Sequence, residues 1–575
     1  MERSVLMYLF LSAFVCDGLC SNYRTVRTPS GPVKGIGIPY NGDMVFQYRN
    51  IPYAEPPVGD LRLQKPVPHR TWTDVLDATT FGPSCIQDVA RIKSLIPKLP
   101  NSNFSEDCLQ LNVYTPNIVS TSQNRKSVMI WVHGGAFMLG QATYYDASNL
   151  VSKGDVIVVT VNYRLGALGF FSTGDDAARG NFGLWDQRLA FQWVKDNIAS
   201  FGGDPDTMTI FGQSAGAFSV GIHATIPLNR GLFTRVISES GGQGSKISVR
   251  QDADLITFEY GRKINCITGA DNHIDMPTLV QCLRRKTTDE IMDAQTNLNS
   301  SLYGGDYGIE FMPVVDGTLI KALPDVLISN STSEEYKFFR SLDIIYGTCS
   351  SEGLVATIIA YGLQKKYGFN ATLEIPTIVL RDEFAPTISR YYYNSNEHVS
   401  RAIYDKYTSK DALTQSKNMI DLFTDYVFLA STVKALNLHS STGLATGGNT
   451  FQYIFSAHGV LKGYVPPVYL EGAWHGAELP FLFGLDGQGV VGNKTADINA
   501  VANTVITYWT NFAKHGNPNS HGLPDWPVYN PVTAEYLNIN TIMSTGSHVA
   551  EDRMRLWNWY IPSLLKLQTS ALIGK

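Results

Sequence analysis

Apolar runs rich in Val and Ile recur along the middle of the chain, and patterns typical of helices separate them. Unbroken apolar runs of this kind are typical of strands that are covered on both faces. Residues 184–203 have an amphipathic helical pattern, which stops at Gly202, Gly203 and Pro205. Strands that alternate with helices predict an α/β fold with a large, mostly parallel central sheet covered by helices on both faces. The predicted strands are 127–135, 155–164, 207–212, 235–241, 342–348 and 450–457.

The 575 residues are expected to form one large domain, because no internal repeat or low-complexity linker interrupts the chain. The N-terminal third is rich in turns and is expected to add antiparallel strands. Residues 350–445 are mainly helical in pattern, for example at 421–436, which indicates helical insertions. The net charge of −5 and the absence of a basic block argue against nucleic acid as a partner.

The first residues have the pattern of a secretory signal peptide. One Arg precedes the apolar run 5–15, and small residues follow near Gly18 and Cys20, which predicts a signal peptide over residues 1–20. About 11 apolar residues are too few to span a bilayer, and no later segment qualifies as a span. We therefore expect a secreted protein with a mature domain over 21–575, and we allow for a homodimer.

The cysteine pattern agrees with secretion. Of seven Cys, the first two are expected to leave with the signal peptide, and an odd number in a secreted chain leaves one thiol over. The economical pairing is local and joins Cys85 to Cys108 and Cys266 to Cys282, which leaves Cys349. No spacing typical of a zinc site is present, so we assign no metal. Expected glycosylation sequons lie at Asn103, Asn299, Asn330, Asn370 and Asn493.

The stretch "TIFGQSAGAFSVG" places Ser214 between Gly212 and Gly216, two residues from each. Apolar residues lead up to the first glycine and small residues follow the serine. This pattern fits a strand that reverses sharply into a helix with a nucleophilic serine at the turn. An ordinary glycine-rich turn is the alternative, because a single G-x-S-x-G arises often by chance.

Other reactive groups also follow predicted strands, and ligands of open α/β sheets bind beyond the carboxyl ends of the strands. Glu352 follows one strand, and both His458 and His475 follow another. A base close to the serine would take its proton, and the acid would orient that base. Position alone does not decide between the two histidines. The backbone N–H groups of Gly134–Gly135 and of Ala215 would face a developing oxyanion.

Several long segments resemble the type-B carboxylesterase and cholinesterase family of α/β-hydrolases. They include "YRNIPYAEPPVGDLRLQKP", "SEDCLQLNVYTP", "NYRLGALGF" and "NFGLWDQRLAFQWVKDNIASFGGDP", in the order that the family has. The resemblance runs from about residue 23 to about residue 565 and is most like a secreted carboxylesterase of invertebrate type. It implies the α/β-hydrolase fold with helical insertions.

The resemblance implies Ser214 as nucleophile, Glu352 as acid and His475 as base. "WHGAELPFLFG" resembles the segment that holds the family's catalytic histidine, so His458 is expected to be a structural residue. The oxyanion donors that the resemblance implies are the backbone N–H groups of Gly135, Ala136 and Ala215.

The resemblance also assigns structural roles. Both disulfides match the family pattern, and Cys349 is expected to be a buried free thiol. Glu106 and Arg164 match a family salt bridge, and Ser240 matches a buried serine that supports the acid. Phe311, with the nearby Ile309, matches the family's acyl-pocket segment, although a phenylalanine in the core is the commoner case.

The chain departs from the members of the family that hydrolyse choline esters. Those members carry a Trp in the loop between the first two paired cysteines, whereas the loop from Cys85 to Cys108 has neither Trp nor Tyr. They also have Glu before the nucleophile, where this chain has Gln213. Their third disulfide has no counterpart here. Trp474, beside the histidine, is the residue that would rebuild a cation site.

These observations predict a secreted serine carboxylesterase that hydrolyses neutral carboxylic esters through an acyl-enzyme and needs no cofactor. Its partner is a small-molecule ester. Two alternatives stay open: a choline-ester hydrolase, and an adhesion or receptor-binding ectodomain that uses the fold without catalysis.

Overall fold

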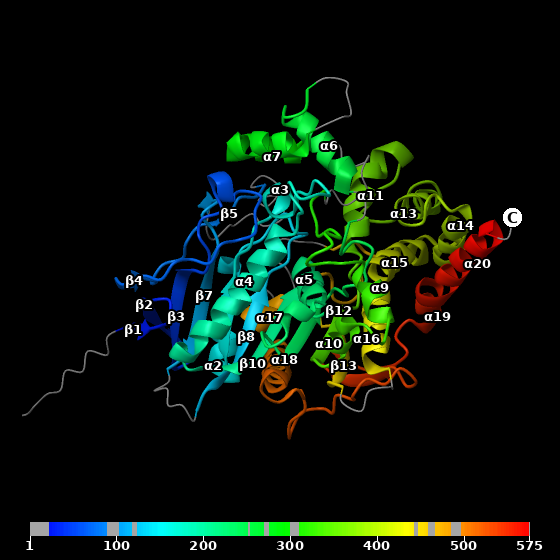
Figure 1. Cartoon of the computed structure of the whole chain (residues 1–575). Helices are drawn as coiled ribbons and strands as arrows, with labels where there is room; N and C mark the ends of the chain where they lie inside the picture. The colour runs from blue at the N-terminus through cyan, green and yellow to red at the C-terminus, as the bar shows by residue number, and fades with distance from the viewer. Residues whose placement is uncertain are drawn as a thin grey trace, which may run out of the picture.

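A 13-stranded sheet forms the centre of the protein (Figure 1). The computed structural model describes residues 22–88, 103–117, 124–250, 253–268, 275–298, 310–441, 447–457, 466–484 and 496–573. The strand order is β1-β2-β3-β7-β9-β8-β10-β11-β12-β13-β14-β15, and β4 pairs with β2. The strands are β1 Tyr23–Arg27, β2 Pro32–Tyr40, β3 Asp43–Pro52, β4 Leu76–Asp77, β7 Gln110–Pro116, β8 Lys126–Val132, β9 Ile157–Val161, β10 Gly203–Gln213, β11 Arg235–Glu239, β12 Asp343–Cys349, β13 Thr450–Phe455, β14 Glu535–Ile539 and β15 Ser544–Ser547, and a separate pair joins β5 Ser84–Cys85 to β6 Phe104–Ser105.

The pairing confirms a mostly parallel sheet with antiparallel strands from the N-terminal part. The six consecutive pairings from β9 through β8 and β10 to β14 are parallel. The strands β1, β2, β3, β7 and β9 pair antiparallel, and β15 is antiparallel at the other edge. Every residue of β9 and β13 is buried, which explains their unbroken apolar sequence.

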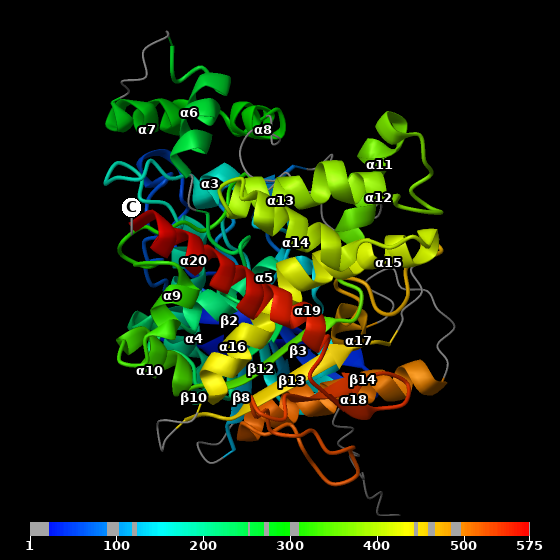
Figure 2. The same ribbon diagram turned by 90° about the vertical axis from the view of Figure 1, so that its right-hand side faces the viewer.

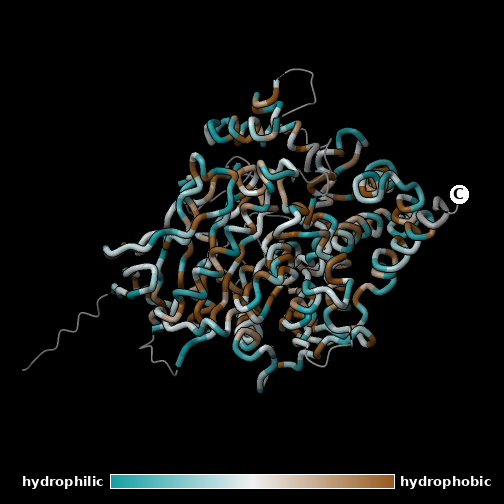
Figure 3. The backbone as a smooth tube through the Cα atoms, viewed as in Figure 1, coloured by the Kyte–Doolittle hydropathy of each residue, from teal (hydrophilic) through white to brown (hydrophobic). Residues whose placement is uncertain are grey.

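Both faces of the sheet are covered. Along β8, Val128, Ile130 and Val132 belong to one apolar cluster, whereas Met129 and Trp131 belong to another, because successive strand residues point to opposite faces. Helices α2 and α18 contact the sheet at the cluster that contains Trp131, and α17 reaches it through Phe481 and Phe483. Helices α4, α5 and α16 contact the sheet on the other side. Figure 3 shows the apolar residues concentrated along the central strands.

Helices also form layers beyond the sheet. Figure 1 shows α11, α13, α14, α15 and α20 together at its right, and Figure 2 turns this group toward the viewer. In both views α6 and α7 lie above the sheet. The helices are α2 Ser148–Gly154, α3 Gly166–Phe170, α4 Phe182–Asn197, α5 Ala215–His223, α6 Ala253–Lys263, α7 Met276–Arg285, α8 Thr288–Thr296, α9 Pro324–Ser329, α10 Glu334–Arg340, α11 Leu354–Tyr367, α12 Thr377–Val379, α13 Ala385–Tyr392, α14 Glu397–Tyr407, α15 Ala412–Phe423, α16 Ala430–Ser440, α17 Leu479–Phe483, α18 Ala496–His515, α19 Glu551–Arg555 and α20 Ile561–Ile573.

Short 3₁₀ and π segments complete the helical structure. Among the described residues, three π-helical turns lie within the helical layers and continue α12, α15 and α19. No helix in the described ranges is both long and apolar enough to cross a membrane. The 3₁₀ turns are η1 Gly59–Leu61, η2 Ala142–Tyr144, η3 Ile198–Phe201 and η4 Pro227–Asn229, and the π turns are η6 Leu380–Phe384, η7 Thr424–Leu429 and η8 Leu556–Tyr560.

The predicted disulfides are confirmed, and the predicted salt bridge is wrong. Cys85 bonds to Cys108 and Cys266 bonds to Cys282. Glu106 and Arg164 line the same small cavity, but each pairs with another residue. The guanidinium of Arg62 holds both carboxylate oxygens of Glu106, at 2.7 and 2.5 Å.

Arg164 pairs instead with Asp186, a buried residue of α4. The two side chains form a two-pronged contact at 2.8 and 2.7 Å, and the backbone N–H of Arg164 also donates to Asp186. A bidentate contact is the preferred geometry between a guanidinium and a carboxylate. Two such contacts therefore replace the single expected bridge.

Candidate active site

Ser214 lies at a sharp turn between β10 and α5, as the glycine pattern predicts. β10 ends at Gln213, α5 begins at Ala215, and Ser214 has φ 58° and ψ −122°. Its backbone N–H donates to the carbonyl of Glu239 at 2.9 Å. This strand–turn–helix geometry exposes a side chain above the end of a sheet.

The two glycines are needed because the turn is tightly packed. A Cβ on Gly216 would lie 2.0 Å from the carbonyl oxygen of Val132, and a Cβ on Gly212 would lie 2.7 Å from the backbone of Gly216. Neither distance leaves room for a side chain. The spacing of glycines around Ser214 is therefore a packing requirement of the turn.

Glu352 and His475 meet at the same edge of the sheet. Nδ1 of His475 lies 2.5 Å from Oε2 of Glu352, and the backbone N–H of Cys349 donates to the other oxygen, Oε1, at 2.6 Å. The carboxylate is 1% exposed. The ring of Phe428, from η7, stacks on the imidazole with ring centres 4.7 Å apart.

The loops that carry the acid and the histidine are bonded to each other. The N–H of Ser351 donates to the carbonyl of Ala473 at 2.9 Å, and the N–H of Ala473 donates to Oγ of Ser350 at 3.0 Å. The hydroxyl of Ser351 also donates to the carbonyl of Glu471. These contacts fix the distance between the acid and the histidine before any substrate binds.

The surroundings of His475 stabilise its protonated form relative to that of a free histidine. Burial lowers the pKa of its imidazole. The charge of Glu352 and the hydrogen bond to it raise this pKa, with a smaller contribution from the charge of Glu478, and together they outweigh burial. The net direction is upward from the ordinary histidine pKa. A carboxylate on Nδ1 thus stabilises the imidazolium that forms when Nε2 takes a proton.

A loop after β8 lies against Ser214. A Cβ on Gly134 would be 3.0 Å from Cβ of Ser214. Gly135 and Ala136 follow with φ of 114° and 56°. In the described part of the chain, the backbone N–H groups of Gly135, Ala136 and Ala215 donate to no protein acceptor. Three unused donors beside a serine are what an oxyanion hole requires.

The expected contact between Ser214 and His475 is replaced by another. Within the described ranges, the Ser214 hydroxyl forms no hydrogen bond. Nε2 of His475 instead lies 3.2 Å from the side-chain nitrogen of Gln213. The amide thus occupies the nitrogen that the serine would use.

The residues expected to contact substrate lie in different surroundings. Phe311 is buried and packs edge-on against Tyr260, with ring centres 5.1 Å apart. Trp474 is partly buried against the cluster that contains Trp131, and its backbone forms a β-bridge with that of Ser351. Ile309 and His458 lie outside the described residues.

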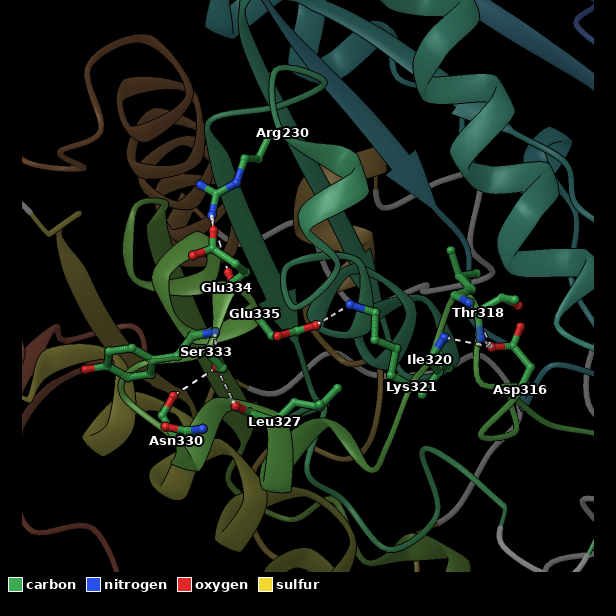
Figure 4. A network of polar contacts seen from close by, with 12 residues as sticks. Arg230, Asp316, Thr318, Ile320, Lys321, Leu327, Asn330, Ser333, Glu334 and Glu335 are labelled. Carbon is green, nitrogen blue, oxygen red and sulfur yellow. Dashed lines mark hydrogen bonds and ion pairs between the residues drawn. The ribbon is translucent and has the colours of Figure 1, made fainter.

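Hydrogen bonds at Val314 and at Asp316 hold the segment that follows Phe311. Val314 exchanges two hydrogen bonds with the side chain of Asn181, each 2.8 Å long. Asp316 then accepts from three successive backbone N–H groups, including that of Ile320. Figure 4 shows this turn beside the ion pair between Lys321 and Glu335.

Buried acidic groups below the histidine were not predicted. The Cys349 thiol is free, as expected, and donates to Oε2 of Glu478 at 2.9 Å. Burial, together with the charge of Glu352, raises the pKa of Glu478 to about 7. Glu239 accepts from the indole of Trp509 at 2.8 Å, and burial raises its pKa well above the usual range. Ser240 is buried as expected, but its hydroxyl has no partner in the described ranges, so the expectation that it bonds to support the acid is wrong.

Sequence reasoning also missed Phe428, because a phenylalanine inside a helical pattern carries no signal of its partner. The position of Glu478, three residues after His475 and directly before α17, is a signal that could have been used. A tight turn joins these two residues, with the N–H of Ala477 bonded to the carbonyl of Trp474, so a charged group three positions after the histidine stays close to it.

Comparison with known proteins agrees with this geometry. The pattern of the "Carboxylesterase family" matches residues 22–557. Carboxylesterase 1D of Rattus norvegicus is 32% identical over 574 residues, 96% of each chain. Carboxylesterase 1E of Mus musculus is 34% identical over 579 residues, 96% of this chain and 97% of its own. A protein of Anas platyrhynchos named "Fatty acyl-CoA hydrolase precursor, medium chain" is 32% identical over 573 residues, 97% of this chain and 96% of its own. The chain therefore belongs to the carboxylesterase family of α/β-hydrolases and is a serine hydrolase of carboxylic esters.

Proposed function

We propose that Ser214, His475 and Glu352 hydrolyse neutral carboxylic esters through an acyl-enzyme. The observation that carries the proposal is the 2.5 Å contact between Nδ1 of His475 and Glu352 at the sheet edge where Ser214 turns into α5. With Nδ1–H held by Glu352, Nε2 is the nitrogen left to act as base.

The reaction follows from these positions. The Ser214 oxygen attacks the ester carbonyl carbon while its proton passes to Nε2 of His475. The carbonyl oxygen becomes an oxyanion and accepts from the N–H groups of Gly135, Ala136 and Ala215. The C–O bond to the alcohol then breaks, and the alcohol leaves with the proton from Nε2. Water repeats the sequence on the acyl-enzyme and releases the acid.

Two features favour uncharged over cationic esters. Quaternary ammonium groups bind aromatic faces, and the segment from Cys85 to Cys108 contains neither Trp nor Tyr. Gln213, directly before the nucleophile, has a neutral amide. The packing of Trp474 against the core argues against a rebuilt cation site.

The substrate experiment compares butyrylthiocholine with its uncharged 3,3-dimethylbutyl isostere. We expect kcat/KM for the uncharged ester to equal or exceed that for the charged one. A preference for the charged ester that is lost at high salt or in Trp474→Ala would instead support a choline-ester hydrolase. One relative is named as a medium-chain fatty acyl-CoA hydrolase, so the acyl series should extend to medium chains.

Labelling identifies the nucleophile. An organophosphate probe should modify a peptide that contains Ser214, and Ser214→Ala should lose labelling and nearly all turnover while the fold is retained. Labelling of the folded protein at another residue would overturn the assignment. Complete absence of labelling and turnover would favour a non-catalytic ectodomain.

We also propose that the protein is secreted and glycosylated. Two disulfides support this, because such bonds persist in oxidising compartments. Asn103, Asn330 and Asn370 are exposed, and the last two each accept from the Thr two residues later; Figure 4 shows Asn330 beside Ser333. Asn299, Asn493 and the predicted signal peptide lie outside the described residues. A mobility shift on removal of N-glycans from secreted protein tests both points.

A further inference from the structure

The side-chain amide of Gln213 lies where it competes with Ser214 for the imidazole. Its nitrogen is 3.2 Å from Nε2 of His475. We propose that Gln213 is a positioning residue whose amide caps Nε2 of His475 in the resting enzyme. When an ester binds, this hydrogen bond breaks and Ser214 bonds to Nε2 instead. The inference rests on the proposed function, because that proposal makes His475 the base.

The side-chain amide of Gln213 lies between Gly134 and Gly476. Its oxygen would lie 2.9 Å from a Cβ on Gly134, and its nitrogen would lie 3.5 Å from a Cβ on Gly476. Gln213 is only 5% exposed. The amide oxygen therefore faces the loop after β8, while the amide nitrogen faces the loop that carries His475.

The hydrogen-bond pattern fixes the roles of donor and acceptor. A carboxylate can only accept, so at the 2.5 Å contact Nδ1 of His475 donates to Glu352 and the lone pair of a neutral imidazole is on Nε2. The N–H of Gln213 donates to this lone pair. The Ser214 hydroxyl must donate to the same lone pair before it attacks. One in-plane lone pair serves one of these donors at a time.

A carboxylate at position 213 would act differently. It has no N–H to donate, and it would accept from the imidazolium instead. The amide keeps the neutral imidazole in the tautomer that the reaction needs while it withholds the base from Ser214. Glutamine and glutamate are therefore not equivalent at this position.

Substrate binding is coupled to release of the cap through Gly134. This residue lies beside the amide oxygen and belongs to the loop that carries the proposed oxyanion donors Gly135 and Ala136. An ester carbonyl held by this loop contacts the segment against which the amide rests. The amide then turns away and Nε2 becomes available to Ser214.

A double-mutant cycle read by ¹⁵N NMR tests the competition directly. The signal is the Nε2 resonance of His475 in the resting protein, read at a pH above the acid limb of kcat/KM, where the imidazole is neutral, and assigned by its loss in His475→Gln. We expect Ser214→Ala to leave this resonance in place in the wild-type background, because Ser214 is not bonded there. In the Gln213→Met background the Ser214 hydroxyl is expected to donate to Nε2. There, Ser214→Ala should remove this bond and move the Nε2 resonance downfield.

Reaction with a small uncharged organophosphate gives a second measurement. Removal of the competing amide in Gln213→Met should raise the rate constant for modification of Ser214 about 2- to 13-fold, the range that corresponds to one net hydrogen bond of ordinary strength. Gln187→Met is the matched control. Gln187 is another buried glutamine that contacts a histidine, His223, at 3.0 Å, and its change should alter neither the His475 resonance nor the rate.

Two results would overturn the cap: an effect of Ser214→Ala on the resonance that is equal in both backgrounds, or an unchanged or lower rate in a folded Gln213→Met variant. The NMR cycle needs no turnover. It therefore reports on the cap even if labelling shows that Ser214 is not the nucleophile, so the failure of the two proposals can be told apart.

Discussion

Replacing Glu352 by Gln should trap His475 in the wrong tautomer. In the wild-type protein, Oε1 accepts from the N–H of Cys349 at 2.6 Å, while Oε2 accepts from Nδ1–H of His475 at 2.5 Å. A glutamine offers only one acceptor. Its oxygen keeps the buried N–H of Cys349 satisfied, because an unpaired buried donor costs about 1–3 kcal/mol.

The amide nitrogen of the new side chain then faces Nδ1. An imidazole that accepts at Nδ1 carries its proton on Nε2, and Nε2–H cannot take the proton of Ser214. The change of a triad carboxylate to its amide lowers kcat about 10⁴-fold in the serine-protease template. That factor corresponds to about 5.4 kcal/mol of transition-state stabilisation.

The assay is single-turnover acylation by p-nitrophenyl acetate, together with ¹⁵N NMR of His475. We expect Glu352→Gln to lose about 10⁴-fold in the acylation rate and to show a protonated Nε2 at neutral pH. Glu352→Asp is the control, since it keeps two acceptors and should lose only about 10²-fold through displacement. Acylation above about a tenth of wild type in Glu352→Gln, or a proton still on Nδ1, would refute the tautomer argument.

Three further outcomes follow from packing and charge. Gly216→Ala should lower turnover at least about 100-fold, because its Cβ would lie 2.0 Å from the carbonyl oxygen of Val132. Gly362→Ala is the control and should leave turnover unchanged, because the space around its Cβ is open. The acid limb of kcat/KM against pH should have its midpoint above 6.5, because Glu352 outweighs burial and raises the pKa of His475; a midpoint below 6.5 would contradict this. Arg553→Met should cost about 3 kcal/mol in urea unfolding at pH 8, because it removes the cation that pairs with the buried Asp425 at 2.8 Å and also with Asp421. Burial raises the pKa of Asp425 to about 7, so this loss should shrink as the pH falls below 7 and Asp425 becomes neutral; a loss independent of pH would refute the assignment.

The order of strands and helices could be predicted because it leaves a periodic pattern. β9 and β13 are buried throughout, so their sequences are apolar at every position. The turn at Ser214 could be predicted because its close packing admits only glycine at two positions. Strands that end at one sheet edge predicted Glu352 and a histidine there, and the family resemblance chose His475 over His458.

Contacts between distant segments left no such pattern. Arg62 and Arg164 are both near Glu106, and nothing in the sequence shows that the buried Asp186 takes one of them. Phe428 reaches His475 only because η7 passes over the site. The contact of Gln213 with Nε2 depends on a side-chain rotamer, which residue type and spacing do not determine.

The bonds between the two catalytic loops have a consequence for how the protein can evolve. Glu352 and His475 are 123 residues apart in sequence, yet backbone contacts between the loops of Ser351 and Ala473 hold them in place. Most of the helices between them can therefore be lengthened, exchanged or rebuilt while the reacting atoms stay where they are; η7 is the exception, because Phe428 touches the imidazole. Changes in α12, α13 and α14 can then accumulate over time while the chemistry is inherited unchanged.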